Sequence, residues 1–226
     1  MALVKSTFKD PKVVEYLIAA GDGEDTVGSA TISNTGTLGA FTGATVPAIA
    51  SATYDLDVDV DGGGNNQLAI ALLNTDDWDG IATKIQTQLQ AATSSTETVA
   101  ITDGKITITS ATDGSTSTIV IAAGTAGSGG GDLIAAITAL GADYTATIDT
   151  PVDGIDGAFT IDVNTQNPAS TCHFVYQVRD SAGLDKTNGL KASYSSSTGK
   201  ITIQDDGTTS ELDAGDVVTV FLVDSN

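Results

Sequence analysis

Polar and apolar residues alternate along the C-terminal part of the chain, in short runs separated by residues typical of turns. The runs are rich in β-branched and aromatic residues, which favour strands, and they occupy residues 159–163, 172–179, 190–194, 200–204 and 217–223. Residues 197–199 and 205–207 have the composition of tight turns. Two further short β candidates lie at 30–34 and 37–41. This spacing predicts an antiparallel β-sandwich, Ig-like or similar.

Residues 51–157 show a different pattern, in which strand and helix periodicities follow one another. Between Tyr54 and Asp61 apolar residues alternate with aspartates, so this strand is expected to have one apolar face and one solvated acidic face. A helix capped by Thr75 is predicted by the stripe Trp78, Ile81, Ala82, Ile85 and Leu89. Further strands are expected at 98–102, 105–110 and 117–122, and a second helix at 133–140. Together they predict a compact two-layer α+β unit.

The change of pattern predicts that one domain is inserted into another. We expect a mainly β protein: a discontinuous β-sandwich of residues 28–50 and 158–226, with an inserted small α+β domain of residues 51–157. Residues 1–27 are expected to form an N-terminal arm with a short helix from 13 to 20, or else a helix that packs on its own domain. The candidate partner-binding residues are the lysines of this arm, Lys5, Lys9 and Lys12.

The chain is strongly acidic, with 9 Lys and Arg against 29 Asp and Glu among 226 residues, and a net charge of −20. A field of this sign repels a phosphate backbone, so we expect no direct nucleic-acid binding. No apolar run approaches the roughly 18 residues of a membrane helix, and the first residues lack the layout of a secretory signal, so no membrane association is expected. A single cysteine, Cys172, fits assembly in a reducing cytosol.

An acidic repeat in the inserted segment is the candidate metal site. Asp57, Asp59 and Asp61, followed by Gly62, match the opening of an EF-hand calcium loop. The twelfth position of that loop needs a glutamate, and Leu68 stands there instead. The alternation with apolar residues already explains the spacing of the aspartates, so a solvated strand face is favoured over a calcium site.

Other residues that could carry chemistry are few. His173 is the only histidine and neighbours Cys172, but adjacent residues of a strand point to opposite faces, which disfavours a paired nucleophile. The glycine-rich stretch 127–132 precedes a helix as a phosphate-binding loop would, yet it places Asp132 where the anion would sit. We therefore expect no catalytic residues, no cofactor and no enzyme activity.

The order of the inserted segment, at Tyr54–Asp61, Asp76–Leu89 and Val99–Ala122, resembles the IN motif of flagellar hook-associated proteins and related modules of tailed-phage virion proteins. Flagellar axial proteins carry long terminal heptads, which this chain lacks. The run 212–221 instead resembles the closing strand of β-rich phage head and tail proteins.

The resemblance implies a structural subunit of a phage particle, made and assembled in the host cytoplasm and located in the virion. It implies a capsid decoration or cement protein that binds the major capsid protein or other virion subunits, and copies of itself. In this interpretation the outer β-domain and the arm attach to the shell, and the acidic inserted domain projects outward. A tail-tube or other tail subunit and a receptor- or carbohydrate-binding adhesin module remain alternatives.

Overall fold

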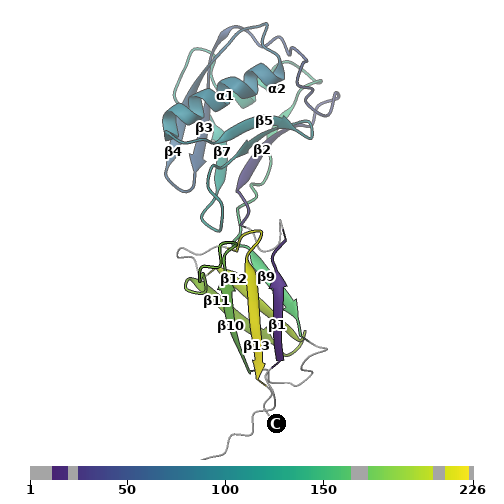
Figure 1. Cartoon of the computed structure of the whole chain (residues 1–226). Coiled ribbons are helices and arrows are strands. Elements are labelled where there is room, and N and C mark those ends of the chain that lie inside the picture. The colour runs from purple at the N-terminus through teal and green to yellow at the C-terminus, as the bar shows by residue number, and fades with distance from the viewer. Residues whose placement is uncertain (1–11, 20–24, 164–172, 206–211, 224–226) are drawn as a thin grey trace, which may run out of the picture. The chain divides into compact units, whose positions relative to one another are not determined.

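The computed structural model describes residues 12–19, 25–163, 173–205 and 212–223. The chain divides into two units: an outer unit, Met1–Asp25 with Asp156–Asn226, and an inserted unit, Thr26–Ile155. Both are built mainly from antiparallel strands, and the described residues contain two helices, both in the inserted unit (Figure 1). The predicted fold class, a β-rich protein with a small α+β insert, is confirmed. No helix of the described part is long and apolar enough to cross a membrane.

The outer unit is a sandwich of two three-stranded antiparallel sheets. One has the order β1 (Lys12–Leu17), β13 (Val217–Val223), β10 (His173–Arg179), and the other the order β11 (Leu190–Ser195), β12 (Lys200–Asp205), β9 (Ala158–Asp162). Side chains from both sheets share one apolar core, which includes Val178, Val218, Ile201 and Ile203. Each strand contributes alternate residues to this core, as the period of a pleated strand requires.

The N-terminal segment is a strand of this sandwich, so the predicted helix at 13–20 and the separate arm of 1–27 are wrong over β1. Strand β1 pairs with β13 along its whole length, from Lys12 opposite Leu222 to Leu17 opposite Val217. Because VVEYLI is too short for its period to distinguish helix from strand, pairing with β13 decides between them. The strand then leads into Ile18, which is buried in the core.

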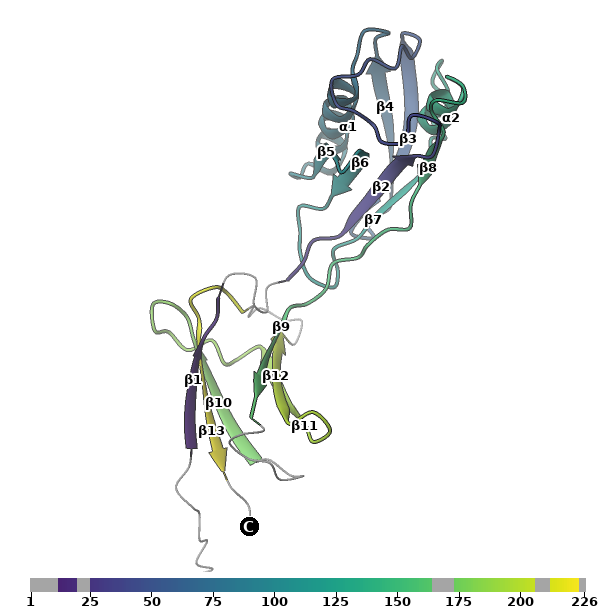
Figure 2. The ribbon, with the colours of Figure 1, turned by 90° about the vertical axis from the view of Figure 1, so that its right-hand side faces the viewer.

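The inserted unit contains two sheets around a second core (Figure 2). One has the order β5 (Thr98–Thr102), β6 (Lys105–Thr109), β2 (Ser29–Asn34), β8 (Ala146–Ile148), and the other the order β4 (Asn65–Leu72), β3 (Ala52–Val60), β7 (Ile119–Ala123). Helix α1 (Trp78–Thr93) contacts β4 and β5, and helix α2 (Leu133–Thr138) contacts β3, β7 and β8. The predicted stripe of α1 is buried from Trp78 to Leu89.

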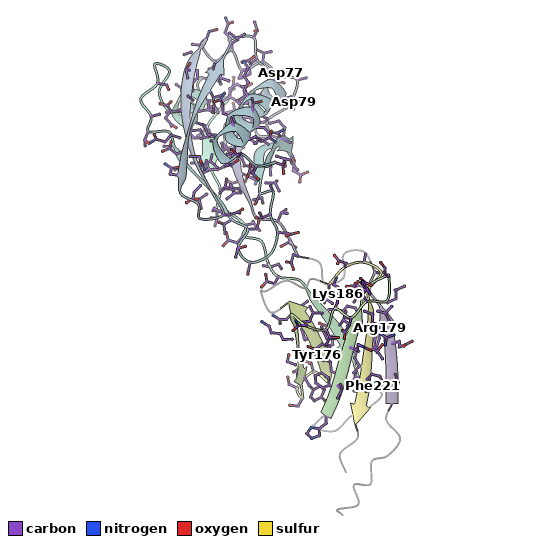
Figure 3. All side chains as sticks on the ribbon, turned by 60° about the vertical axis from the view of Figure 1, so that its left-hand side comes forward. Asp77, Asp79, Tyr176, Arg179, Lys186 and Phe221 are labelled. Atoms are coloured by element: carbon purple, nitrogen blue, oxygen red, sulfur yellow. The ribbon has the colours of Figure 1, made fainter. Side chains whose placement is uncertain are left out.

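Helix α1 begins two residues later than a Thr75 cap would place it. Its N-cap is Asp77, whose side chain accepts a hydrogen bond of 2.8 Å from the Gly80 N–H, and Asp79 lies in the first turn (Figure 3). Asp76 instead accepts from the Leu73 N–H at 2.7 Å and pairs with Lys84. The helix ends at Thr93, and its C-cap Ser94 adopts a left-handed conformation with φ of 57°.

Strand β2 places the start of the inserted unit at residue 26, so the predicted boundary at 51 is wrong. It lies between β6 and β8, opposite Ile106–Thr109 on one side and Ala146–Ile148 on the other. The sequence pattern assigned 30–34 to the sandwich because a short amphipathic strand does not indicate its partner. The stretch 37–41 forms turns, whereas strands β4 and β8 were not predicted.

The two ends of the inserted unit are hydrogen-bonded to each other. The Thr26 N–H donates to the Ile155 carbonyl at 3.0 Å, and the Ile155 N–H donates to the Thr26 hydroxyl at 2.9 Å. Ser29 and Val152 exchange both backbone hydrogen bonds, at 2.7 and 2.8 Å. The chain therefore leaves and re-enters the outer unit through adjacent segments, which is the geometry that a domain insertion needs.

Candidate functional site

Two aspartates of β3, Asp55 and the candidate metal residue Asp57, are covered by a loop and do not form a solvated face. Asp55 is 1% exposed and Asp57 is 2% exposed, and the prediction of a solvated acidic face is wrong for both. Residues 124–131, between β7 and α2, hydrogen-bond to these two carboxylates. The contacts join residues about 70 positions apart, which the alternation along one strand could not reveal.

Hydrogen bonds from this glycine-rich loop satisfy most of the buried carboxylate oxygens. The Ser128 N–H donates to Asp55 Oδ2 at 2.7 Å, and the Thr125 hydroxyl donates to Asp57 Oδ2 at 2.7 Å. Asn65 Nδ2 donates to the same Asp57 oxygen at 2.9 Å. The loop lies so close that a Cβ on Gly130 would be 2.7 Å from the carbonyl oxygen of Thr53, which is why this position needs glycine.

Asp132 and Asp61 fix the loops on either side of the buried pair. Asp132 accepts from the Gly124 N–H through Oδ1 and caps α2 by accepting from the Ala135 N–H through Oδ2, both at 2.8 Å. Asp61 accepts from the hydroxyl of Thr112 at 2.7 Å and from the N–H of Thr118 at 3.0 Å. These carboxylates therefore act as hydrogen-bond acceptors that order loops.

The hydrogen bonds around Asp55 favour its ionised form. The pKa of Asp55 lies below the ordinary aspartate value, mainly because the Ser128 side chain donates a hydrogen bond to it. Burial acts in the opposite direction and is outweighed. Its Oδ1 atom is buried and has no hydrogen-bond partner within the described residues. Across the described ranges, no three His, Cys, Asp or Glu side chains are arranged to hold a metal ion. The expectation that Asp57, Asp59 and Asp61 bind no calcium stays a prediction, tested below.

Of the remaining candidate residues, the structure describes two, Lys12 and His173. His173 is exposed at the first position of β10, while Cys172 lies outside the described residues. Lys12 begins β1, and its backbone lies opposite Leu222. Lys5 and Lys9 also lie outside the described residues. The predicted partner-binding lysines are therefore placed only in part: one starts a strand of the sandwich and the others precede it.

The lysines of the inserted unit are paired with carboxylates. Lys84 pairs with Asp76, and Lys105 with Asp149 at 2.9 Å. The Lys105 hydrogen bond is the largest influence on Asp149, and it holds the pKa of that carboxyl below its usual value despite partial burial. For Asp76, burial would raise the pKa, but hydrogen bonds from the Leu73 N–H and Lys84 lower it overall.

A lysine also joins two loops of the outer unit. Lys186 Nζ donates to Asp213 at 2.6 Å and to the buried Asp216 at 2.8 Å. Burial alone would lower the pKa of Lys186, yet the two carboxylates outweigh it and hold that pKa above the ordinary value. This ion-paired cluster ties the segment after β10 to the turn before β13.

Two hollows in the inserted unit have few reactive groups. One of about 350 Å³ is lined by residues that include Asp61, Thr93 and Glu97, and Glu97 accepts from the Thr93 hydroxyl at 2.8 Å. Another of about 300 Å³ is lined mainly by apolar residues, including Ile49, Tyr54 and Leu140. Neither lining contains histidine, cysteine, lysine or arginine. The acidic groups that line them are engaged in local hydrogen bonds.

An exposed apolar row crosses the outer face of the sheet β1-β13-β10, and sequence reasoning missed it. Val13, Phe221 and Val175 are direct cross-strand neighbours, and they are 53%, 36% and 62% exposed. Leu17, Val217 and Arg179 form another row of this face, four positions along each strand (Figure 3 labels Phe221 and Arg179). The signal in the sequence was the run 217–223, which is apolar except at Thr219 and predicts a strand with apolar residues on both faces.

Comparison with known proteins gives little. No protein-family model and no curated protein matches the chain. Among solved structures, the chain is similar to the flagellar protein FliD (HAP2) from Pseudomonas aeruginosa PAO1, at 16% identity, over 95% of this chain and 84% of that chain, with a TM-score of 0.28. A likeness this low carries no argument about fold or function. The resemblance to phage virion proteins has no support from these comparisons.

Proposed function

We propose that this chain is a non-enzymatic structural subunit of a phage particle, a capsid decoration or cement protein. Its outer unit attaches to the assembled shell, and its acidic inserted unit projects into solvent. The observation that carries the proposal is the unequal distribution of basic residues between the two units, together with an exposed apolar row on the outer unit.

Basic residues are concentrated in the outer unit. The inserted unit contains 14 acidic residues and two lysines, a net charge of −12, and the lysines are already paired with Asp76 and Asp149. The outer unit contains 15 acidic and seven basic residues, a net charge of −8. An acidic unit repels other acidic surfaces and stays hydrated, so attachment is expected through the outer unit.

The outer unit also offers an apolar surface for attachment. Its sheet β1-β13-β10 exposes the row Val13, Phe221 and Val175, and exposed apolar patches on soluble proteins mark interaction sites. The basic residues Lys5 and Lys9 precede this sheet in the sequence. Partners of this surface would be the major capsid protein, other virion subunits or further copies of the chain.

The proposal is tested by co-sedimentation with undecorated capsid shells. The full chain should sediment with the shells, and the inserted unit alone, residues 26–155, should stay in the supernatant. A variant lacking residues 2–11, which keeps all of β1, should bind less while its melting temperature is unchanged. Failure of the full chain to bind shells, or equal binding by the inserted unit, would contradict the proposal. Rings or rods of the purified protein under negative stain would favour a tail-tube subunit instead.

A further inference from the structure

The outer face of the sheet β1-β13-β10 differs from the rest of this acidic molecule. In a chain with a net charge of −20, its outward positions include the exposed apolar residues Val13, Leu17, Val175 and Phe221. This face carries one charged residue of each sign, Glu15 on the β1 edge and Arg179 on the β10 edge. This face is therefore close to neutral, and it can approach an acidic surface without the repulsion that the rest of the chain imposes.

One row of this face is symmetrical about the central strand, whereas the row of Leu17, Val217 and Arg179 is not. Phe221 on β13 lies between Val13 on β1 and Val175 on β10, so the row has a valine at each edge. The next row places Glu15 and Gln177 on either side of Thr219. A twofold axis along β13 would therefore bring each edge of the sheet over the opposite edge of a second copy.

We infer that a second copy of this chain covers this face, with the two sheets packed face to face about a twofold axis parallel to β13. Val13 of each copy then lies against Val175 of the other, and the two Phe221 rings meet at the axis. Glu15 lies over Gln177 and one row from Arg179 of the other copy, where a hydrogen bond and charge attraction favour the contact.

The alternative twofold axis, perpendicular to the strands, is unfavourable. It would centre on the row Glu15, Thr219 and Gln177 and place the two Glu15 carboxylates opposite each other. Like charges directly opposite destabilise a pairing. Arg179 also interacts with a carboxylate of its own chain, Asp185. The pKa of Asp185 is lowered, chiefly by hydrogen bonds from Thr187 and to a smaller extent by the charge of Arg179.

The size of the face predicts a weak contact. Three strands spaced about 4.8 Å apart, with about 20 Å of strand length, give a patch on the order of 300 Å², whereas a standard interface buries about 800 Å² per partner. We therefore expect weak self-association of the isolated chain, which is seen only at high protein concentration. Such a contact forms when copies of the chain are held close together, as they would be on a phage particle. In this respect the inference rests on the proposed function.

The experiment is sedimentation-velocity ultracentrifugation of the full chain up to millimolar concentration. The wild type should show concentration-dependent dimerisation. Val175→Lys places a charge against Val13 of the other copy, and Phe221→Lys places two charges together at the axis, so each should weaken dimerisation at least tenfold. The matched control is Val120→Lys, because Val120 is an outward valine, 49% exposed, on the edge strand β7 of the inserted unit. This control adds the same charge and should dimerise as the wild type does.

Each outcome decides the inference. A wild type that stays monomeric at these concentrations overturns it, as does a dimer that Val175→Lys and Phe221→Lys leave intact. Circular dichroism melts of both variants establish that their outer units are folded, since outward positions of a sandwich tolerate lysine. Shell binding is a separate measurement: a wild type that stays monomeric but still co-sediments with the shells refutes this contact and leaves the proposed function standing.

Discussion

Excision of the inserted unit is the most direct test of how this chain is organised. Residues 26–155 would be replaced by a short Gly-Ser linker between Asp25 and Asp156. The eleven buried residues of the outer core all lie outside 26–155, so the excision removes none of them. Asp25 already accepts a hydrogen bond from the Gly157 N–H at 2.7 Å, so the cut ends are close and a short linker can join them.

The expected change in the free energy of unfolding follows from the residues that each cut removes. With its core complete, the outer unit should change in stability by only about 1 kcal/mol, the scale on which loop length acts. A cut at the boundary expected from sequence, 51–157, removes β2 from the inserted fragment. That fragment loses Ile32, Phe41 and Ile49, which are buried in its core. At roughly 1.5–3 kcal/mol for each large side chain, the loss is about 5–9 kcal/mol, comparable with the whole stability of a domain.

The assay is thermal unfolding by circular dichroism, with amide hydrogen exchange, on three proteins: the outer unit with its linker, fragment 26–155 and fragment 51–157. The first two should unfold cooperatively, and the third should show no cooperative transition. Trp78 fluorescence reports on the core of both fragments, because this side chain is fully buried and contacts Phe41 and Tyr144. A fragment 51–157 as stable as 26–155 would refute the assignment of β2, and an unfolded outer unit would refute its independence.

Three further predictions concern single residues. Asp77→Ala should destabilise the inserted unit by about 1 kcal/mol in urea titration because it removes the cap of α1, and Thr75→Ala, which removes no cap, should have no effect. Asp149 has a lowered pKa, so its stabilisation is full above the unfolded value of about 3.9 and is lost as the pH falls through the folded value. Lys105→Met should remove part of this acid dependence, at most about 1 kcal/mol. Unfolding free energies that fall equally steeply below pH 5 in the variant and the wild type would contradict it. Asp59→Asn keeps an oxygen that can accept from the Gly64 N–H, so its melting temperature should match the wild type in EDTA and in calcium; a rise of several degrees with calcium in wild type alone would establish a metal site.

Several elements could be predicted because their local pattern admits one structure. The apolar stripe from Trp78 to Leu89 predicts helix α1, and all five stripe residues are buried in it. The alternation at 200–204, bounded by turn residues, predicts β12, whose Ile201 and Ile203 are fully buried. In these segments periodicity and turn chemistry agree, so the local sequence is sufficient.

Other features depended on residues far away in the chain. The run from Val13 to Ile18 is compatible with helix or strand, and its pairing with β13, about 200 residues later, makes it a strand. Strand β2 reads as any short amphipathic strand, and only β6 and β8 on its two sides assign it to the inserted unit. A strand's sequence specifies which face is apolar but does not identify its partner.

The aspartates of β3 show the same division between local and distant information. Their alternation with apolar residues determined the strand and its two faces, and that part is observed. From the sequence alone, the second face was expected to be exposed to solvent, because aspartate side chains on a strand are normally hydrated. Only the tertiary structure brings the loop at 124–131 over Asp55 and Asp57, where its N–H and hydroxyl donors replace water. Burial of a charged group depends on distant donors, and periodicity along one strand carries no information about them.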